Sequence, residues 1–209
     1  MLNAMSIFLS TMSVVLAYFI GAVPSSWVLV RLLSKSDMRG DPDGKISAAS
    51  VYYRLGALPF AISVVMDMAL AAIAVLLALW ISGSGFVAMI AGLVAMIGHD
   101  WSPYLKFKGG QGATSLAGAM APVMPVYLLI GMVVAIIATR LTKRSGLGTA
   151  IGVLAIALSA LIWGNSFAVA DVYPEEWLPI YPLALITIMF VKRVQLGKSY
   201  RNGPGSEKS

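Results

Sequence analysis

Long apolar runs with little charge constrain this chain more than any other feature. Residues 6–33 carry almost no charge between Ser6 and Arg31, and the chain continues with five further apolar runs. Those runs cover residues 57–81, 85–98, 113–139, 146–163 and 177–191. They are continuous rather than alternating, and most approach the roughly 20 residues that a helix needs to cross a bilayer. The sequence therefore predicts an all-α, polytopic integral membrane protein.

Composition excludes several other classes of protein. Hydrophobic residues make up 59% of the chain and charged residues only 11%, against about a quarter in soluble domains. The chain is too apolar to be disordered, and without cysteine it is not a disulfide-stapled module. The net charge of +6 does not indicate nucleic acid, because no soluble folded unit carries it. It indicates orientation in a bilayer and an anionic lipid or phosphorylated partner.

The first apolar run is interpreted as a retained membrane helix rather than a signal peptide. No basic region precedes it, and it is about twice as long as the apolar part of a typical signal peptide. We expect one membrane-embedded domain over residues 1–209, with residues 192–209 forming a basic cytoplasmic tail.

The basic residues predict the number of crossings. All fifteen Lys and Arg residues fall in clusters at residues 31–54, 106–108, 140–144 and 192–208. Six simple crossings would place two of these clusters opposite the other two, against the positive-inside rule. A break at Pro122 and Pro125 would divide the fourth run into a half-helix, 113–122, and a segment, 126–139. This gives seven membrane segments in the inner (plasma) membrane, with the N-terminus outside and all basic clusters and the C-terminus in the cytoplasm.

A glycine-rich segment comes directly before the expected half-helix. Gly109, Gly110 and Gly112 allow backbone amides to turn toward one point, and the helix that follows presents free N–H groups. Such a place binds phosphate, and Lys106 and Lys108 add positive charge. The alternative is a tight turn in which the glycines only permit close helix packing and the lysines reach toward lipid headgroups.

Four further polar positions are candidates. In the turn-rich loop of residues 34–54, Asp37 and Arg39 form a structural ion pair, or Arg39 meets a substrate phosphate that Asp37 helps to orient. Asp67 lies about ten residues into an apolar run, where a carboxylate faces a polar interior and is expected to orient the cytoplasmic loops. His99 is the only histidine and is a general base, a phosphate donor, or a structural group beside Asp100.

Several segments occur in the same order as in one known family. They are residues 21–24, 37–39, 44–51, Asp67, 98–99 and 107–112. In these segments the chain resembles the acyl-phosphate-dependent glycerol-3-phosphate acyltransferases of the bacterial PlsY family. The resemblance implies seven helices, no metal or cofactor, and transfer of a fatty acyl group from acyl phosphate to the 1-hydroxyl of glycerol 3-phosphate. Lysophosphatidic acid, a phospholipid precursor, would be the product, and membrane lipid would surround the site.

The resemblance also implies a set of site residues. The substrate-binding positions are Asp37, Arg39, Gly44, Ser47, Ser50, Lys108, Gly109, Gly110, Gln111, Gly112 and Ser115. The catalytic candidates are His99, Lys45 and Arg54. Asp67 is expected to orient the cytoplasmic loops without contacting the substrate. Acyl phosphate is already activated, so the site needs to position two anions and stabilise developing charge, without a protein nucleophile. A phosphate oxygen of a bound substrate is expected to accept the hydroxyl proton.

This chain departs from the family pattern in its first loop. The family usually has Ser-Gly-Asn-x-Gly-Ala-Thr-Asn-Val-x-Arg where this chain has residues 43–53. Arg54 stands one position after the expected arginine, a shift of about 100° around a helix. Most of the loop's usual polar side chains are therefore changed.

Other departures remove positive charge. Gln111 stands where the family has a lysine between the glycines, and Asp67 is followed by Leu70 and Ala71 in place of Lys-Gly. The family's C-terminal His and Asn are not recognisable in residues 191–197. We expect Lys45 and Arg54 to offset part of this loss.

Three functions remain compatible with the sequence. The first is the acyltransferase with a rearranged site, and the second is an inactive relative that binds lipid phosphate or an active copy. The third is a small transporter using the broken helix and Asp67. Transport is disfavoured because the polar groups gather at one membrane face and the two halves show no inverted repeat.

Overall fold

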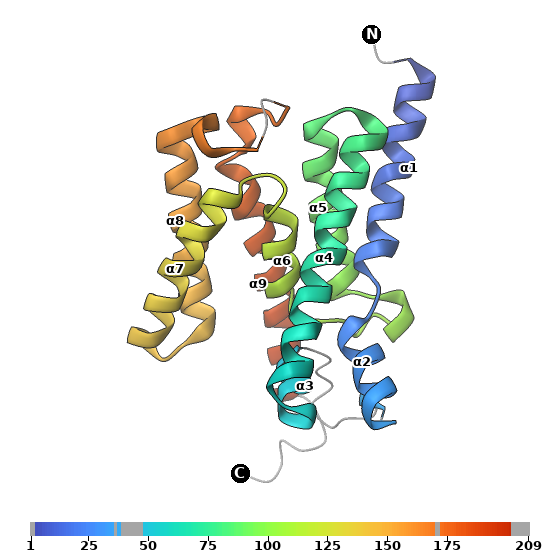
Figure 1. The fold of residues 1–209 in the computed structure, drawn as a ribbon, viewed down its shortest axis with the longest axis vertical. Coiled ribbons are helices and arrows are strands. Elements are labelled where there is room, and N and C mark those ends of the chain that lie inside the picture. Colours follow the sequence, from blue (N-terminus) through green and yellow to red (C-terminus); the bar gives the residue numbers. More distant parts are fainter. Residues whose placement is uncertain (1–2, 36, 39–47, 170–171, 202–209) are drawn as a thin grey trace.

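The computed structural model describes residues 3–35, 37–38, 48–169 and 172–201. Within these ranges the chain is helical and has no strand, and the helices form one bundle (Figure 1). Six helical segments are long and apolar enough to cross a membrane. The predicted all-α, polytopic architecture is therefore confirmed.

The first membrane segment contains a break that the sequence analysis did not predict. Helix α1 spans Ala4–Gly21 and helix α2 spans Ser25–Ser34. Between them, Pro24 has no amide hydrogen to donate and disfavours helical geometry in the residue before it. The helix therefore ends and begins again, and the carbonyl of Ala22 accepts a hydrogen bond from elsewhere in the chain.

Helix α3, Ala48–Leu55, occupies the second half of the segment that we expected to be a turn-rich loop. Ala48 and Val51 are buried, whereas Tyr53 is 86% exposed. This amphipathic pattern gives the helix one face for the bundle and one face for its surroundings. The expectation of a loop was therefore wrong for residues 48–54.

Helices α4, Ala57–Ser82, and α5, Gly85–Asp100, pack closely with α1. Small residues fill the contact: Ala17, Ala74, Ala78, Ala91 and Ala95. A Cβ atom added to Gly21 would lie 2.0 Å from the carbonyl oxygen of Ala95, so the backbones of α1 and α5 touch. Small residues at such contacts are typical of membrane helices. This packing fixes the end of α5 beside the break between α1 and α2.

The predicted break at Pro122 and Pro125 is present. Helix α6 spans only Ala113–Met120, and helix α7 spans Pro125–Thr142. Eight residues extend about 12 Å, less than half of the bilayer core. Helix α6 is therefore a half-helix, and it packs against α4, α5 and α9 inside the bundle. With the six long segments it completes the expected seven.

Helices α8, Ser145–Trp163, and α9, Ile180–Arg201, complete the bundle. Helix α8 pairs with α7, while α9 contacts α5, α6 and α8. The main core lies between these helices and includes Met96, Met120, Met124, Tyr127 and Leu185. Helix α9 continues to Arg201, so the first part of the expected basic tail is helical.

The start of α1 and the end of α9 lie at opposite ends of the bundle (Figure 1). Toward the end of α9 lie α2, α3 and the turn between α7 and α8. The acidic turn at Glu175–Trp177 lies toward the other end, with the start of α1. The seven-segment prediction requires this arrangement.

Candidate functional site

Asp67 is the centre of a polar cluster inside the bundle. It is 3% exposed on α4, and the hydroxyl of Ser25 donates a hydrogen bond to its Oδ1 atom. The hydroxyl of Thr114 donates to Oδ2 at 2.8 Å, and Nδ1 of His99 lies 3.9 Å from Oδ1. One carboxylate therefore connects the first residue of α2, the start of α6 and the end of α5.

His99 lies in a small cleft. Its polar lining comes from Ser25, Ser26 and Ser102, and Val23, Pro24, Leu105 and Gly110 line the rest. A Cβ atom added to Gly110 would lie 2.1 Å from Nε2 of His99, so the imidazole rests directly on the glycine backbone. One ring nitrogen therefore faces Asp67 and the other faces the glycine-rich segment.

Hydrogen bonds fold the glycine loop, defined here as residues 101–112, back onto the end of α5. The amide of Gly109 donates to the carbonyl of Asp100 at 3.2 Å, and that of Gly110 donates to the carbonyl of His99 at 3.0 Å. The hydroxyl of Ser102 donates at 2.6 Å to the carbonyl of Ala22, at the break between α1 and α2. Two of the amides expected in a phosphate cradle are thus used by the loop itself. The amides of residues 111–115 are the remaining candidates.

Helix α6 begins at the end of this loop. Gly112 caps it with a φ of 73°, which a glycine adopts without a steric penalty. The first hydrogen bond of the helix runs from the amide of Leu116 to the carbonyl of Gly112, so the amides of residues 113–115 come before it. Ser115 is 1% exposed, and its hydroxyl has no hydrogen-bond partner in the described part of the chain. These donors and the positive end of the helix favour an anion here.

Positions 108 and 111 of the glycine loop differ in charge. Lys108 is exposed, and Gln111 is half-buried next to the cap of α6. The side chain at position 111 therefore offers a hydrogen bond where the family's lysine would offer a charge.

A second buried polar group joins α9 to the glycine loop. Lys192 is 4% exposed, and its ammonium donates a hydrogen bond to the carbonyl of Asp100. This carbonyl lies at the C-terminal end of α5, where the helix dipole stabilises a positive charge. It also lies 5.0 Å from the ring centre of Trp101, whose indole N–H donates to Gln195 at 3.0 Å. Asp100 is fully buried, and within the described ranges neither of its carboxylate oxygens has a hydrogen-bond partner.

The segment of residues 34–54 is only partly described. Asp37 accepts hydrogen bonds from the indole of Trp27 at 2.9 Å and from Arg31 at 3.5 Å, so these two partners come from α2. Four predicted site residues lie outside the described residues: Arg39, Gly44, Lys45 and Ser47.

Ser50 and Arg54 lie on α3. Arg54 comes one helical turn after buried Val51, whereas Tyr53 is on the opposite side of the helix. Position 54 is therefore nearer than position 53 to the face that packs on the bundle. Leu105 of the glycine loop packs with Val51, together with Val30 and Met38. This contact holds α3 beside the glycine loop.

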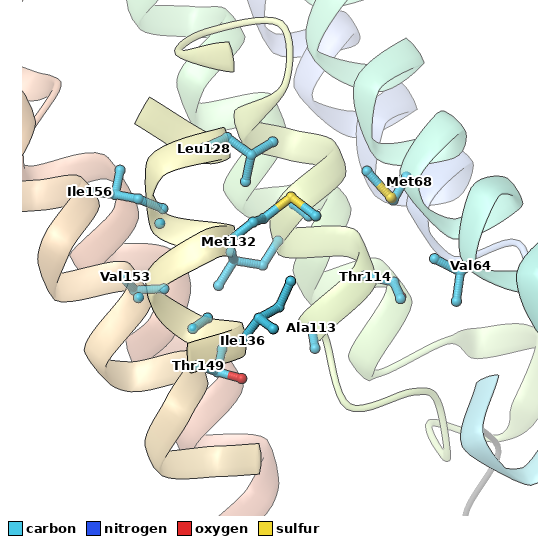
Figure 2. A pocket seen from close by; sticks show the side chains of 15 residues that line it. Val64, Met68, Ala113, Thr114, Leu128, Met132, Ile136, Thr149, Val153 and Ile156 are labelled. Carbon is cyan, nitrogen blue, oxygen red and sulfur yellow. The ribbon is translucent and has the colours of Figure 1, made fainter. Parts of the chain in front are cut away.

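An apolar groove begins at the start of α6. It has a volume of about 270 Å³ and is lined by residues of α4, α6, α7 and α8. Met132 and Ile136 of α7 extend across the gap toward Ala113 and Thr114 of α6 (Figure 2). Because Met132 is 42% exposed and Ile136 is 57% exposed, the groove is open along one side.

Comparison with known proteins identifies the family. Residues 11–198 match the sequence profile of the family described as glycerol-3-phosphate acyltransferase. The chain belongs to the glycerol-3-phosphate acyltransferase family. A glycerol-3-phosphate acyltransferase of Thermoanaerobacter pseudethanolicus is 31% identical over 158 residues, which cover 75% of this chain and 79% of that protein. Glycerol-3-phosphate acyltransferase 1 of Dehalococcoides mccartyi is 34% identical over 162 residues, covering 74% and 76%.

Two solved structures share the fold of this glycerol-3-phosphate acyltransferase family member. Both are crystal structures of PlsY, an integral membrane glycerol 3-phosphate acyltransferase. The glycerol 3-phosphate form has a TM-score of 0.73 at 18% identity, and the lysophosphatidic acid form has 0.75 at 20%. Each comparison covers 91% of both chains. The resemblance to the PlsY family is therefore confirmed.

The structure brings only part of the predicted site together. Asp67, His99 and Gly110 form one cluster, and Gly112 and Ser115 lie at the adjoining start of α6. Among the polar residues of this region that sequence reasoning missed are buried Ser25 and Lys192 and half-buried Thr114. Ser25 follows a helix-breaking proline and Thr114 follows the glycines, so a hydroxyl next to a helix break was the available signal. Lys192 gave no such signal, because it stands among other basic residues.

Proposed function

We propose that this protein transfers a fatty acyl group from acyl phosphate to the 1-hydroxyl of glycerol 3-phosphate. One observation carries the proposal: the candidate anion site and the apolar groove meet at the start of α6. Thr114 belongs to both, because its amide is one of those that come before the first hydrogen bond of α6 and its side chain lines the groove. A phosphate at the helix terminus would therefore place an attached acyl chain in the groove, which is what an acyl phosphate requires.

The reaction needs positioning more than a protein nucleophile. The 1-hydroxyl oxygen attacks the acyl carbonyl carbon, the bond from that carbon to the phosphate oxygen breaks, and the hydroxyl proton passes to a phosphate oxygen. The remaining amides at the start of α6 would bind phosphate or the developing oxyanion. His99 would contact the reacting groups from the end of α5, and Asp67 would hold His99 and Thr114 in place.

Charge compensation is part of this proposal. Gln111 supplies no charge, so Lys45 and Arg54 would act on the bound phosphate in its place, with Lys108 at the edge. The position of Arg54 beside the packed face of α3 supports this role. The substitution at position 111 also favours the second candidate, an inactive relative that binds lipid phosphate without turnover.

Acylation assays on purified protein separate these possibilities. Phosphate release and lysophosphatidic acid formation are measured from acyl phosphate, with and without glycerol 3-phosphate. Wild type should show acceptor-dependent transfer, Lys45→Ala and Arg54→Ala should each reduce it steeply, and Gln111→Lys should partly rescue Lys45→Ala because both cations serve one anion. Arg144→Ala, in the turn between α7 and α8, is the matched control and should be active.

Two results would overturn parts of the proposal. If wild-type protein shows no acceptor-dependent transfer and Gln111→Lys does not create it, the inactive relative is the remaining candidate. Full activity after loss of both Lys45 and Arg54 would contradict compensation while leaving the transferase in place.

We also infer that the basic end of the bundle faces the cytoplasm from the inner (plasma) membrane, with the N-terminus outside. The gathering of α2, α3 and the α7–α8 turn at one end supports this orientation (Figure 1). The chain has no cysteine, so single cysteines report topology directly. An impermeant reagent should label Ser166→Cys in intact cells and Ser145→Cys only after permeabilisation. Labelling of Ser145→Cys in intact cells would reverse the assignment.

A further inference from the structure

The apolar groove is closed at one end by the path of the chain. Helices α6 and α7 are joined by the short turn at residues 121–124 and diverge from it (Figure 1), and Leu128 is the lining residue of α7 nearest to that turn. Leu128 lies at this end of the groove (Figure 2) and is 7% exposed. Met124 and Tyr127, one turn or less before it on the chain, are fully buried in the core. The groove is therefore blind at Leu128.

The open end lies where the candidate anion site begins. Ala113 and Thr114 of α6 line it, with Ile136 on the α7 side. Ile136 and Leu128 are eight residues apart on one helix, which corresponds to about 12 Å of groove wall. An extended hydrocarbon zigzags, so its carbon–carbon bonds of about 1.5 Å advance it by about 1.3 Å each, and roughly nine methylenes fit into that length.

We propose that Leu128 is a specificity-determining residue that sets how much of an acyl chain the protein buries. This inference rests on the proposed function, because it takes the acyl chain of acyl phosphate or lysophosphatidic acid as the occupant of the groove. Continuity of the groove with the candidate anion site at Thr114 carries that choice. Carbons beyond the length of the groove leave through its open side, past exposed Met132.

For short-chain donors that reach the groove from water, each methylene buried in the groove should raise affinity about fourfold, the equivalent of about 0.8 kcal/mol, whereas chains that partition into lipid gain less. For wild type, kcat/KM should therefore climb steeply with chain length up to about ten carbons and then level off, because later carbons are already outside. Removing the Leu128 side chain deepens the groove by about the size of three carbon groups, so the change of slope should move about two carbons longer.

The experiment uses acyl phosphates and lysophosphatidic acids of graded chain length. Transfer is measured as kcat/KM, and binding is measured in parallel as the rise in unfolding temperature with each lysophosphatidic acid. Leu128→Ala should move the change of slope in both series. Met132→Trp fills the groove from its exposed wall, so the change of slope should move to shorter chains. This variant is used if Leu128→Ala does not fold. Leu129→Ala, the 62% exposed neighbour outside the groove lining, is the control and should match wild type.

The outcomes distinguish this inference from the proposed function. No transfer at any chain length would remove the proposed function, while the lysophosphatidic acid series would still test the groove. The role of Leu128 would be overturned if the chain length at which the slope changes were the same as in wild type for both Leu128→Ala and Met132→Trp. A shift in Leu129→Ala as large as that in Leu128→Ala would do the same.

Discussion

Replacing Gly110 with alanine should disable the site while leaving the bundle folded. The added Cβ atom would lie 2.1 Å from Nε2 of His99, 2.8 Å from Cδ2 and 3.0 Å from Cε1. Ordinary contacts begin near 3.4 Å, so the ring has to move by about 1.3 Å. It has little free space, because its side chain is 12% exposed and Nδ1 lies 3.9 Å from Asp67. The imidazole must therefore leave the position that it holds in the cluster.

The size of the effect follows from that displacement. Misplacing a positioned group by about 1 Å costs on the order of a hundredfold in rate, which corresponds to about 2.7 kcal/mol of activation free energy. We expect this loss in kcat of acyl transfer to glycerol 3-phosphate. Gly83→Ala is a suitable control, because Gly83 has a φ of 64° and no neighbour within 4 Å of an added Cβ atom. It introduces backbone strain of about 1 kcal/mol without displacing a side chain.

A double-mutant cycle checks the cause. Gly110→Ala should cost about a hundredfold in wild type and little in a His99→Ala background, because the ring it displaces is already absent. Thermal unfolding in detergent confirms that each variant is folded. A folded Gly110→Ala variant with wild-type kcat would refute the reasoning, as would an equal loss in both backgrounds.

Two further predictions concern the buried polar groups. Asp67→Asn should reduce kcat/KM by roughly tenfold to a hundredfold, since Ser25 and Thr114 both donate to the carboxylate and a charged acceptor is worth about 1.5–3 kcal/mol per bond; activity within twofold of wild type would contradict it. Lys192→Met should lower the unfolding temperature in detergent, because it removes the hydrogen bond to the carbonyl of Asp100 and the cation near the buried Asp100 carboxylate. Asp100→Asn should relieve only the part of that loss that comes from the carboxylate, and an equal loss in both backgrounds would show that the two side chains are not coupled.

The helix breaks show which features of the fold the local sequence can predict. The charge pattern required an extra turn within residues 113–139, where Pro122 and Pro125 lie, so the half-helix was predictable. Pro24 is the same kind of signal, but the charge pattern required no turn within residues 6–33, and their apolar character hides the break. The helix α3 was missed because its polar face made the segment look like a loop.

The same limit applies to the site, where some residues were predictable from the local sequence and others depend on helix packing. Asp67 was predictable because a carboxylate inside an apolar run is costly wherever that run folds. Its partners were not, since a hydroxyl in a helix commonly bonds to its own backbone, and only the packing of α2, α4 and α6 brings Ser25 and Thr114 to it. Lys192 reaches Asp100 across 92 positions of sequence, a contact set by how α9 packs against α5.

The open side of the groove determines how the supply of a lipid-like substrate should be expressed. A chain that enters past Met132 and Ile136 comes from the bilayer without passing through bulk water. Its effective concentration is then its mole fraction among the surrounding lipids, while glycerol 3-phosphate is counted per volume of water. Adding inert lipid or detergent at constant total substrate should therefore slow the reaction by surface dilution. An apparent KM for the acyl donor has meaning only with the amount of lipid stated beside it.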